Sequence, residues 1–175
     1  PVSDLIADRL SVTMWLAALS MAFVVVVSIP LGILAARFRG GIADRVITLI
    51  SQAAMAIPPF FLGILLTLVF GIMLSWFTPG AYVSIEQDPA GFFAYLIFPA
   101  VSVAIPKIAM TVKFLRSSVI RQMRLDYVRT ARSKGNKESA VLIRHVLKNA
   151  LIPVVTFLGM AAADVLAGSI IVEQV

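Results

Sequence analysis

Residues 12 to 36 read VTMWLAALSMAFVVVVSIPLGILAA, a run of 25 positions without one charged side chain. A helix rises about 1.5 Å per residue, so this run is long enough to cross a hydrocarbon layer of about 30 Å with some tilt. Inside such a layer the backbone polar groups must pair with one another, and a helix pairs them within itself. The run therefore predicts a membrane-spanning helix.

Three further apolar segments follow this run. The second span contains Pro58 and Pro59, which each remove a backbone donor and clash with the preceding turn, so we expect a kink or break near the bilayer centre. The expected spans are about 12–36, 46–74, 92–112 and 150–172. This pattern predicts an all-α polytopic membrane protein with four transmembrane helices in one domain, residues 1–175.

The composition agrees with this fold class and excludes several kinds of site. Apolar residues make up 60% of the chain and charged residues 14%, against roughly 45–50% and 25% in soluble domains. There is no cysteine, which excludes a disulfide framework, a thiolate zinc site and a cysteine nucleophile. The single histidine, His145, leaves little basis for a histidine-rich metal site. We therefore predict no catalytic, cofactor-binding or metal-binding residues.

The basic residues predict which side of the membrane each loop faces. Short cytoplasmic loops carry the excess of Lys and Arg. The loop from Arg37 to Arg45 has three arginines and one acid, and the loop from Ser75 to Gly91 has two acids and no basic residue. Segment 113–149 has ten basic residues against two acids. This segment is therefore expected in the cytoplasm and the Ser75 loop outside, as strict alternation of the four helices also requires.

Segment 113–149 has the pattern of a helical hairpin. Two sets of apolar residues recur at helical spacing, and Gly135, which can adopt a left-handed helix-ending conformation, lies between them. We expect Asn136 to cap the second helix. The first set is Ile120, Met123, Tyr127 and Ala131, and the second is Val141, Leu142, Val146 and Leu147.

Three roles are compatible with this basic hairpin. Its charges can simply enforce orientation and touch anionic lipid. Binding of nucleic acid is a poor alternative, because a helix pair tethered between two spans cannot easily enter a groove. A docking surface for a soluble partner is the third, since a short helix held by two membrane helices can insert into a partner's groove and move with it.

The residues from Asp126 to Gly135 and from His145 to Pro153 resemble the coupling loop of the permease subunits of ATP-binding-cassette importers, and most closely the peptide/nickel branch. In the general permease loop Glu-Ala-Ala is followed by a glycine. Here Arg129, Thr130 and Ala131 replace the first three and Gly135 matches the glycine. The absent glutamate and the 18-residue gap from Gly135 to Pro153 depart from the general family and look like that branch's own version.

The resemblance implies the central four helices of a six-helix permease subunit in a bacterial or archaeal inner membrane. Its implied partners are two cytoplasmic ATP-binding subunits, a second permease subunit and an extracytoplasmic solute-binding protein. The chain has no Gly-rich phosphate loop of its own, so ATP hydrolysis is expected in the partner and the chain is expected not to be an enzyme. The residues that match the coupling loop are Arg129, Thr130, Ala131, Arg132, Lys134, Gly135 and Asn136.

Four residues at membrane depth are candidates for the pathway or a hinge. Ionisable residues there indicate a functional site by default, which applies to Lys107 and Asp164. We expect these two to contact each other, although the Lys107 stem could instead extend to the interface and Asp164 could instead bond to a helix neighbour. Pro58 and Pro59 are either a hinge or a static kink.

The expected function is ATP-driven import, with the solute left open among dipeptides, oligopeptides, nickel complexes and glutathione. The alternatives are an ion-coupled secondary transporter with a site at the broken second span and a membrane scaffold that only recruits a partner. Two points count against the secondary transporter. These 175 residues show no internal inverted repeat of the kind found in such transporters, and an ion-coupled transporter would not need the element between Arg129 and Pro153.

Overall fold

The computed structural model describes residues 2–76, 85 and 87–172, and side chains from 10 to 166 within these ranges. The described residues form helices and turns without a strand. The elements are α1 (Val2–Arg37), α2 (Ile42–Ala56), α3 (Pro59–Leu66), the π-helical η1 (Thr67–Met73), α4 (Pro89–Gln122), α5 (Asp126–Ser133), α6 (Glu138–Ala140), the π-helical η2 (Val141–Val146) and α7 (Leu147–Val172). This confirms the predicted all-α class.

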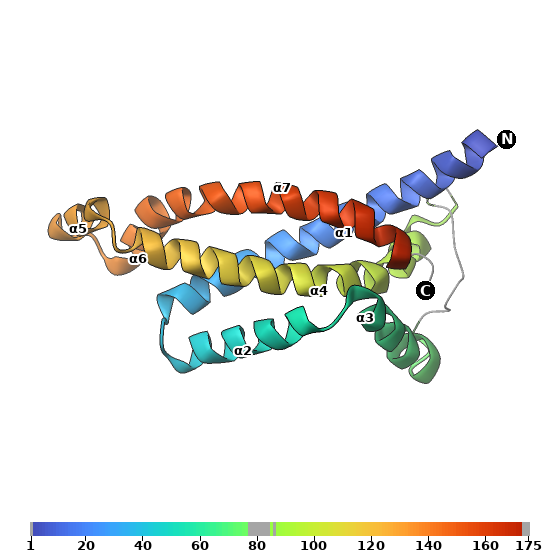
Figure 1. Ribbon diagram of the computed structural model, residues 1–175, viewed down its shortest axis with the longest axis horizontal. Helices are drawn as coiled ribbons and strands as arrows, with labels where there is room; N and C mark the ends of the chain where they lie inside the picture. The colour runs from blue at the N-terminus through green and yellow to red at the C-terminus, as the bar shows by residue number, and fades with distance from the viewer. Residues whose placement is uncertain (1, 77–84, 86, 173–175) are drawn as a thin grey trace.

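The long helices α1, α4 and α7 run side by side and form the body of the molecule (Figure 1). Within the described residues, three segments are long and apolar enough to cross a membrane: Leu10–Arg37, Pro89–Gln122 and Glu138–Leu166. The pair formed by α2 with α3 and η1 passes the same test as one broken unit, and gives a fourth span if it is counted as one. The predicted polytopic fold is therefore confirmed.

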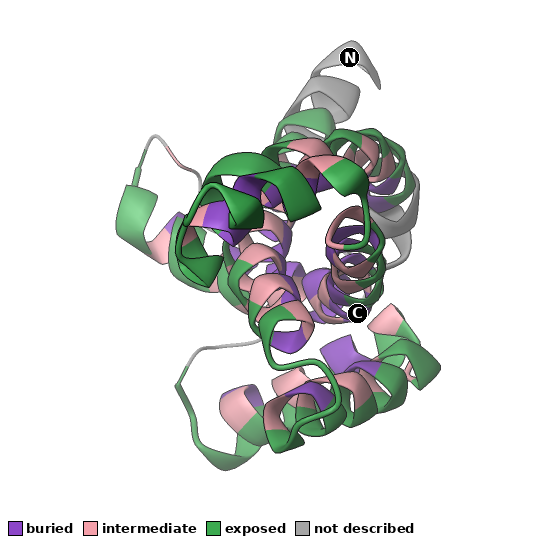
Figure 2. Cartoon of the chain, turned by 90° about the vertical axis from the view of Figure 1, so that its left-hand side faces the viewer, coloured by how far each residue is buried: buried purple, intermediate pink, exposed green. Residues whose placement is uncertain are grey.

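The buried side chains lie on the inward faces of these helices (Figure 2). At one end, Leu16 of α1 packs with Phe92 and Leu96 of α4. At the other end, Leu115 of α4 and Val154 of α7 belong to a larger cluster that also includes α5 and η2. Ser118 of α4 donates a hydrogen bond of 2.9 Å to the carbonyl of Ala150, which ties α4 directly to α7.

The double proline breaks the second span, as predicted. Ile57 is extended, with φ −97° and ψ 122°, because a residue before proline is disfavoured in the helical region. Pro58 is extended too, and Pro59 begins α3, where a missing N–H has no consequence. The two halves meet at 95°. Single prolines behave differently: Pro30, Pro99, Pro106 and Pro153 all lie inside continuous helices.

Segment 113–149 differs from the predicted hairpin of two separate helices. Helix α4 continues ten residues beyond position 112, to Gln122, and the last helix begins at Glu138 and continues through η2 into α7. The single helix expected through Ile120 and Ala131 is wrong, because the chain turns at Met123–Leu125. The apolar residues still recur at helical spacing across this turn, because Met123, Tyr127 and Ala131 all pack on the same cluster. We call residues 123–137 the α5 hairpin.

The close approach of α1 to α4 depends on Gly32. A Cβ atom at this position would lie 2.9 Å from Leu115 Cδ2 and 3.0 Å from Leu115 Cβ, closer than side chains normally approach. Leu115 is fully buried and belongs to the cluster shared by α4, α5 and α7. Glycine is therefore required here so that the two backbones can come together.

We expect Gly32→Val to destabilise the fold by about 1 to 3 kcal/mol, the usual cost of overpacking a filled core. Thermal unfolding of the purified protein in detergent measures the change. Gly159→Val is the matched control, because no atom lies within 4 Å of a Cβ at that helical glycine. Equal stability of both variants would contradict the assigned role of Gly32, whereas partial recovery in Gly32→Val/Leu115→Ala would support it.

Candidate functional site

The α5 hairpin projects beyond one end of the bundle, at the left of Figure 1, on the same side as the turn between α1 and α2. It is attached through one face of α5, where Val128 and Ala131 are buried. These residues pack into the cluster that contains Val141, Leu142 and Val146 of η2. The hairpin is therefore packed onto the neighbouring ends of α4 and of the last helix, which we call their inner ends. It is an ordered part of the fold.

The residues predicted to couple to a partner divide between the surface and the core. Ala131 is buried, so it anchors α5 and does not face a partner in this structure. The others are exposed: Arg129, Thr130, Arg132, Lys134, Gly135 and Asn136. The hairpin thus presents a basic surface that points away from the bundle.

The Arg132 side chain is held by Glu138 at the start of the next helix. Its Nε and Nη2 atoms donate hydrogen bonds of 3.0 and 2.5 Å to the two carboxylate oxygens of Glu138. The carboxylate raises the pKa of the Arg132 guanidinium above its ordinary value. Because both groups are exposed, this pair orients the turn and adds little stability.

The turn after α5 is formed by Gly135 and Asn136. Gly135 has φ +80°, in the left-handed region, as predicted, and its N–H donates to the carbonyl of Arg132 at 2.9 Å. The predicted role of Asn136 is wrong: Lys137, and not Asn136, occupies the N-cap of α6. The Asn136 side-chain amide donates instead to the carbonyl of Ala131 at 2.9 Å, so it provides a hydrogen-bond donor for a carbonyl group in the last turn of α5.

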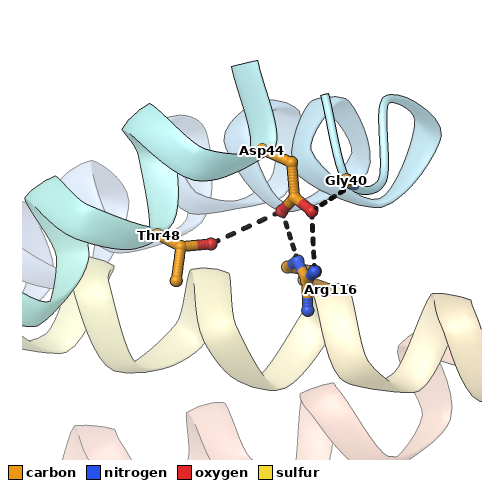
Figure 3. A network of polar contacts seen from close by, with 4 residues as sticks. All are labelled: Gly40, Asp44, Thr48 and Arg116. Atoms are coloured by element: carbon orange, nitrogen blue, oxygen red, sulfur yellow. Dashed lines mark hydrogen bonds and ion pairs between the residues drawn. The ribbon is translucent and has the colours of Figure 1, made fainter. Parts of the chain in front are cut away.

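A partly buried ion pair that the sequence did not predict joins the start of α2 to α4 (Figure 3). Arg116 donates from Nε and Nη2 to the two oxygens of Asp44, at 2.5 and 2.7 Å. The same carboxylate accepts the Gly40 N–H at 2.8 Å and the Thr48 hydroxyl at 3.4 Å. The one acid in an arginine-rich turn was the available signal, but its partner is 72 positions away.

Lys107 of α4 and Asp164 of α7 are in contact, as expected from the sequence. The distance from Lys107 Nζ to Asp164 Oδ2 is 2.9 Å. The lysine side chain is 19% exposed and the aspartate 69%. Asp164 therefore presents its free side outward from the α4–α7 pair. Pro58 and Pro59 lie at the break between α2 and α3 and are not part of this contact.

The described residues contain no group of three or more histidine or acidic side chains that could hold a metal ion. The polar features of the site are therefore the exposed basic hairpin, the Asp44–Arg116 pair and the Lys107–Asp164 pair. All three involve either α4 or the elements packed against its inner end.

Long apolar helices, a bent helical pair and a projecting basic hairpin define a polytopic membrane protein. The family described as binding-protein-dependent transport system inner membrane component matches residues 28–175, and the chain belongs to it. This confirms the predicted resemblance to permeases of ATP-binding-cassette importers of the peptide/nickel branch. The predicted inner-membrane location is confirmed as well.

Curated relatives cover the whole chain. It is 37% identical over 175 residues to a putative peptide transport system permease protein of Brucella abortus. It is 37% identical over 177 residues to the oligopeptide transport system permease protein AppB of Bacillus subtilis, and 38% identical over 175 residues to the glutathione transport system permease protein GsiC of Pectobacterium atrosepticum. The chain spans 55 or 56% of the length of these relatives.

We expect Asp44→Ala to lower the stability of the protein by about 1 to 3 kcal/mol, because it leaves the partly buried Arg116 guanidinium without its partner. Removal of both charges in Asp44→Ala/Arg116→Met should cost less than Asp44→Ala alone. Glu138→Gln is the control: it breaks an exposed pair and should cost below about 1 kcal/mol. Unfolding by heat in detergent gives all three values, and equal losses in the two single variants would contradict this ranking.

Proposed function

We propose that this chain forms the translocation pathway of an ATP-driven importer for peptides or a related small solute, such as a nickel complex or glutathione. The observation that carries the proposal is the α5 hairpin, a basic helix anchored by buried residues on the ends of two transmembrane helices. Membership of the family and the names of the relatives support the same role.

In this proposal the hairpin transmits movement from ATP-binding subunits to the membrane. The exposed side chains Arg129, Thr130 and Lys134 insert into a groove of the ATP-binding subunit, while Val128 and Ala131 hold α5 against the bundle. Movement of the groove then displaces the inner ends of α4 and α7 together. Since a ligand shifts a conformational equilibrium only through different affinities for the two states, the hairpin must bind the two ATPase states differently.

The remaining partners follow from the same proposal. ATP hydrolysis takes place in the separate ATP-binding subunits, so this chain is not itself an enzyme. A second permease subunit, identical or related, completes the pathway, and an extracytoplasmic binding protein delivers the solute. The break at Pro58 and Pro59 is a candidate hinge of the pathway, and Lys107 and Asp164 are candidates for its lining. An ion-coupled secondary transporter is not favoured, because the family is one of binding-protein-dependent systems.

We expect substitutions at Gly135 to uncouple ATP hydrolysis from uptake while membrane insertion is retained. Proline locks φ near −65°, whereas this turn needs φ +80°, so Gly135→Pro should displace the end of α5. Gly135→Asp places a negative charge on the basic surface. Gly135→Asn is the conservative control, because asparagine tolerates the left-handed region and no atom lies within 4 Å of a Cβ there.

The measurement is ATP hydrolysis and solute uptake by the complete importer in proteoliposomes. Uptake should fall at least about tenfold for Gly135→Pro and Gly135→Asp, with the ATPase subunits still assembled, and should be largely retained for Gly135→Asn. Unchanged uptake in the first two variants would contradict the coupling role.

A crosslinking experiment tests the partner directly. The 175 residues contain no cysteine, so a single introduced thiol reports without background from this chain. We expect Arg129→Cys and Lys134→Cys, both exposed on the hairpin, to crosslink to the ATP-binding subunit in the complete importer. Val155→Cys, exposed on α7, should not. Absence of the ATP-binding subunit from every hairpin crosslink would overturn the proposal.

A further inference from the structure

Two contacts join α4 to α7 at equal spacing along both helices. Lys107 meets Asp164 at 2.9 Å, and the rings of Phe114 and Phe157 stack with centroids 5.0 Å apart. Each helix advances seven residues from one contact to the other, in opposite directions. At about 1.5 Å per residue the two contacts are therefore about 10 Å apart. The aromatic pair is the one nearer the α5 hairpin.

We call the α4–α7 face between these two contacts, together with the open cavity at its end toward the hairpin, the groove. Met110 of α4 and Met160 of α7 lie between them in the sequence and are both exposed. An open cavity of about 260 Å³ occupies the end toward the hairpin, lined by Met55, Met110, Lys113, Phe114, Ser117 and Phe157. The lining residues come from α2, α4 and α7, and α4 lies between the other two helices in Figure 1.

The two ends of the groove carry opposite charges. At one end, Asp164 bonds to Lys107 through Oδ2, and no described residue bonds to its Oδ1 atom. At the other end, Lys113 lines the cavity and forms no ion pair with a described residue. Lys113 follows Lys107 by six residues, which is about 9 Å along α4. One Asp164 oxygen and the Lys113 ammonium group, both without a partner among the described residues, thus lie at opposite ends of an apolar, aromatic surface.

An ionised carboxylate this exposed at membrane depth is costly if it faces lipid, so such groups face water-filled cavities or partners. Lys107 donates a hydrogen bond to Oδ2 of Asp164 and so fixes one of its oxygens. The carboxylate is therefore suited to accept a second hydrogen bond from a cationic group without loss of the first. Methionine and aromatic side chains between the charged ends accept varied apolar groups.

We propose, building on the importer function above, that this groove holds a short zwitterionic peptide in transit. Its amino group bonds to Asp164 and its terminal carboxylate to Lys113, while an apolar side chain lies on Phe114 and Phe157. An extended chain covers about 3.3–3.6 Å per residue, so a dipeptide or tripeptide matches the separation of the two charged ends. Lys107 is a positioning residue that keeps the Asp164 carboxylate oriented.

The first test asks whether the groove is open to water in the complete importer. Asp164→Cys and Met160→Cys should react with a charged, membrane-impermeant thiol reagent. Val155→Cys is the matched control: it is 64% exposed and nine positions from Asp164, which places it on the opposite side of α7. No reaction at either groove position would mean that lipid or a second copy of the chain covers this face, and would overturn the proposal.

The second test measures uptake of trialanine, its N-acetyl form and its C-terminal amide by the importer in proteoliposomes. Each variant is compared with the wild type for the same solute, so that selection by the binding protein cancels. Asp164→Asn should lower kcat/KM about tenfold for trialanine and for the amide and leave the N-acetyl form unchanged. Lys113→Gln should lower it for trialanine and the N-acetyl form and leave the amide unchanged.

Lys107→Met should act on the same solutes as Asp164→Asn, and Val155→Cys should leave all three rates unchanged. Equal effects of Asp164→Asn and Lys113→Gln on every solute, or no effect of either, would overturn the proposed polarity of the groove. If the wild type takes up none of the solutes in the presence of ATP, the importer function for peptides fails. If the wild type takes up the solutes normally and the variants do not change that uptake, only the proposal that the groove binds the peptide fails, and the importer function stands.

Discussion

The structure depends on one constraint: within a hydrocarbon layer, backbone polar groups must be satisfied by the protein itself. Helices α1, α4 and α7 meet it by being continuous over most of their length, even across single prolines. Among the residues that the structure describes, the helical backbone is interrupted in the middle of a span at Ile57 and Pro58 alone. Irregular backbone at that depth is tolerated where it is covered by protein or lines an aqueous space. The break therefore has to lie against neighbouring helices or a pathway and not against lipid.

Helix α4 connects the features that the proposed function uses. It packs closely on α1 at Gly32, binds the start of α2 through Arg116, and contacts α7 through Lys107 and Phe114. Its inner end shares a core with α5. Movement of the α5 hairpin cannot leave α4 in place without breaking this buried cluster. The hairpin and the groove are thus parts of one packed unit.

Much of the fold was predictable because apolar runs, prolines and basic loops are strong local signals. Three continuous apolar helices, a bent pair broken at Pro58 and Pro59, and the left-handed Gly135 follow from residues near one another in sequence. The Lys107–Asp164 contact was expected because oppositely charged side chains at membrane depth usually form pairs, which lowers the cost of burying each charge. The Asp44–Arg116 pair was not predicted, since Arg116 was one of ten basic residues in its segment and nothing local distinguishes it. The turn at Met123–Leu125 was hidden because both sides of it face the same core.

The continuity of the last helix has a mechanical consequence. Glu138, beside the hairpin, and Asp164, in the membrane, belong to one uninterrupted rod, about 39 Å apart along its axis. A helix of that length acts as a lever: a tilt of a few degrees at the Glu138 end becomes a displacement of ångströms at the Asp164 carboxylate.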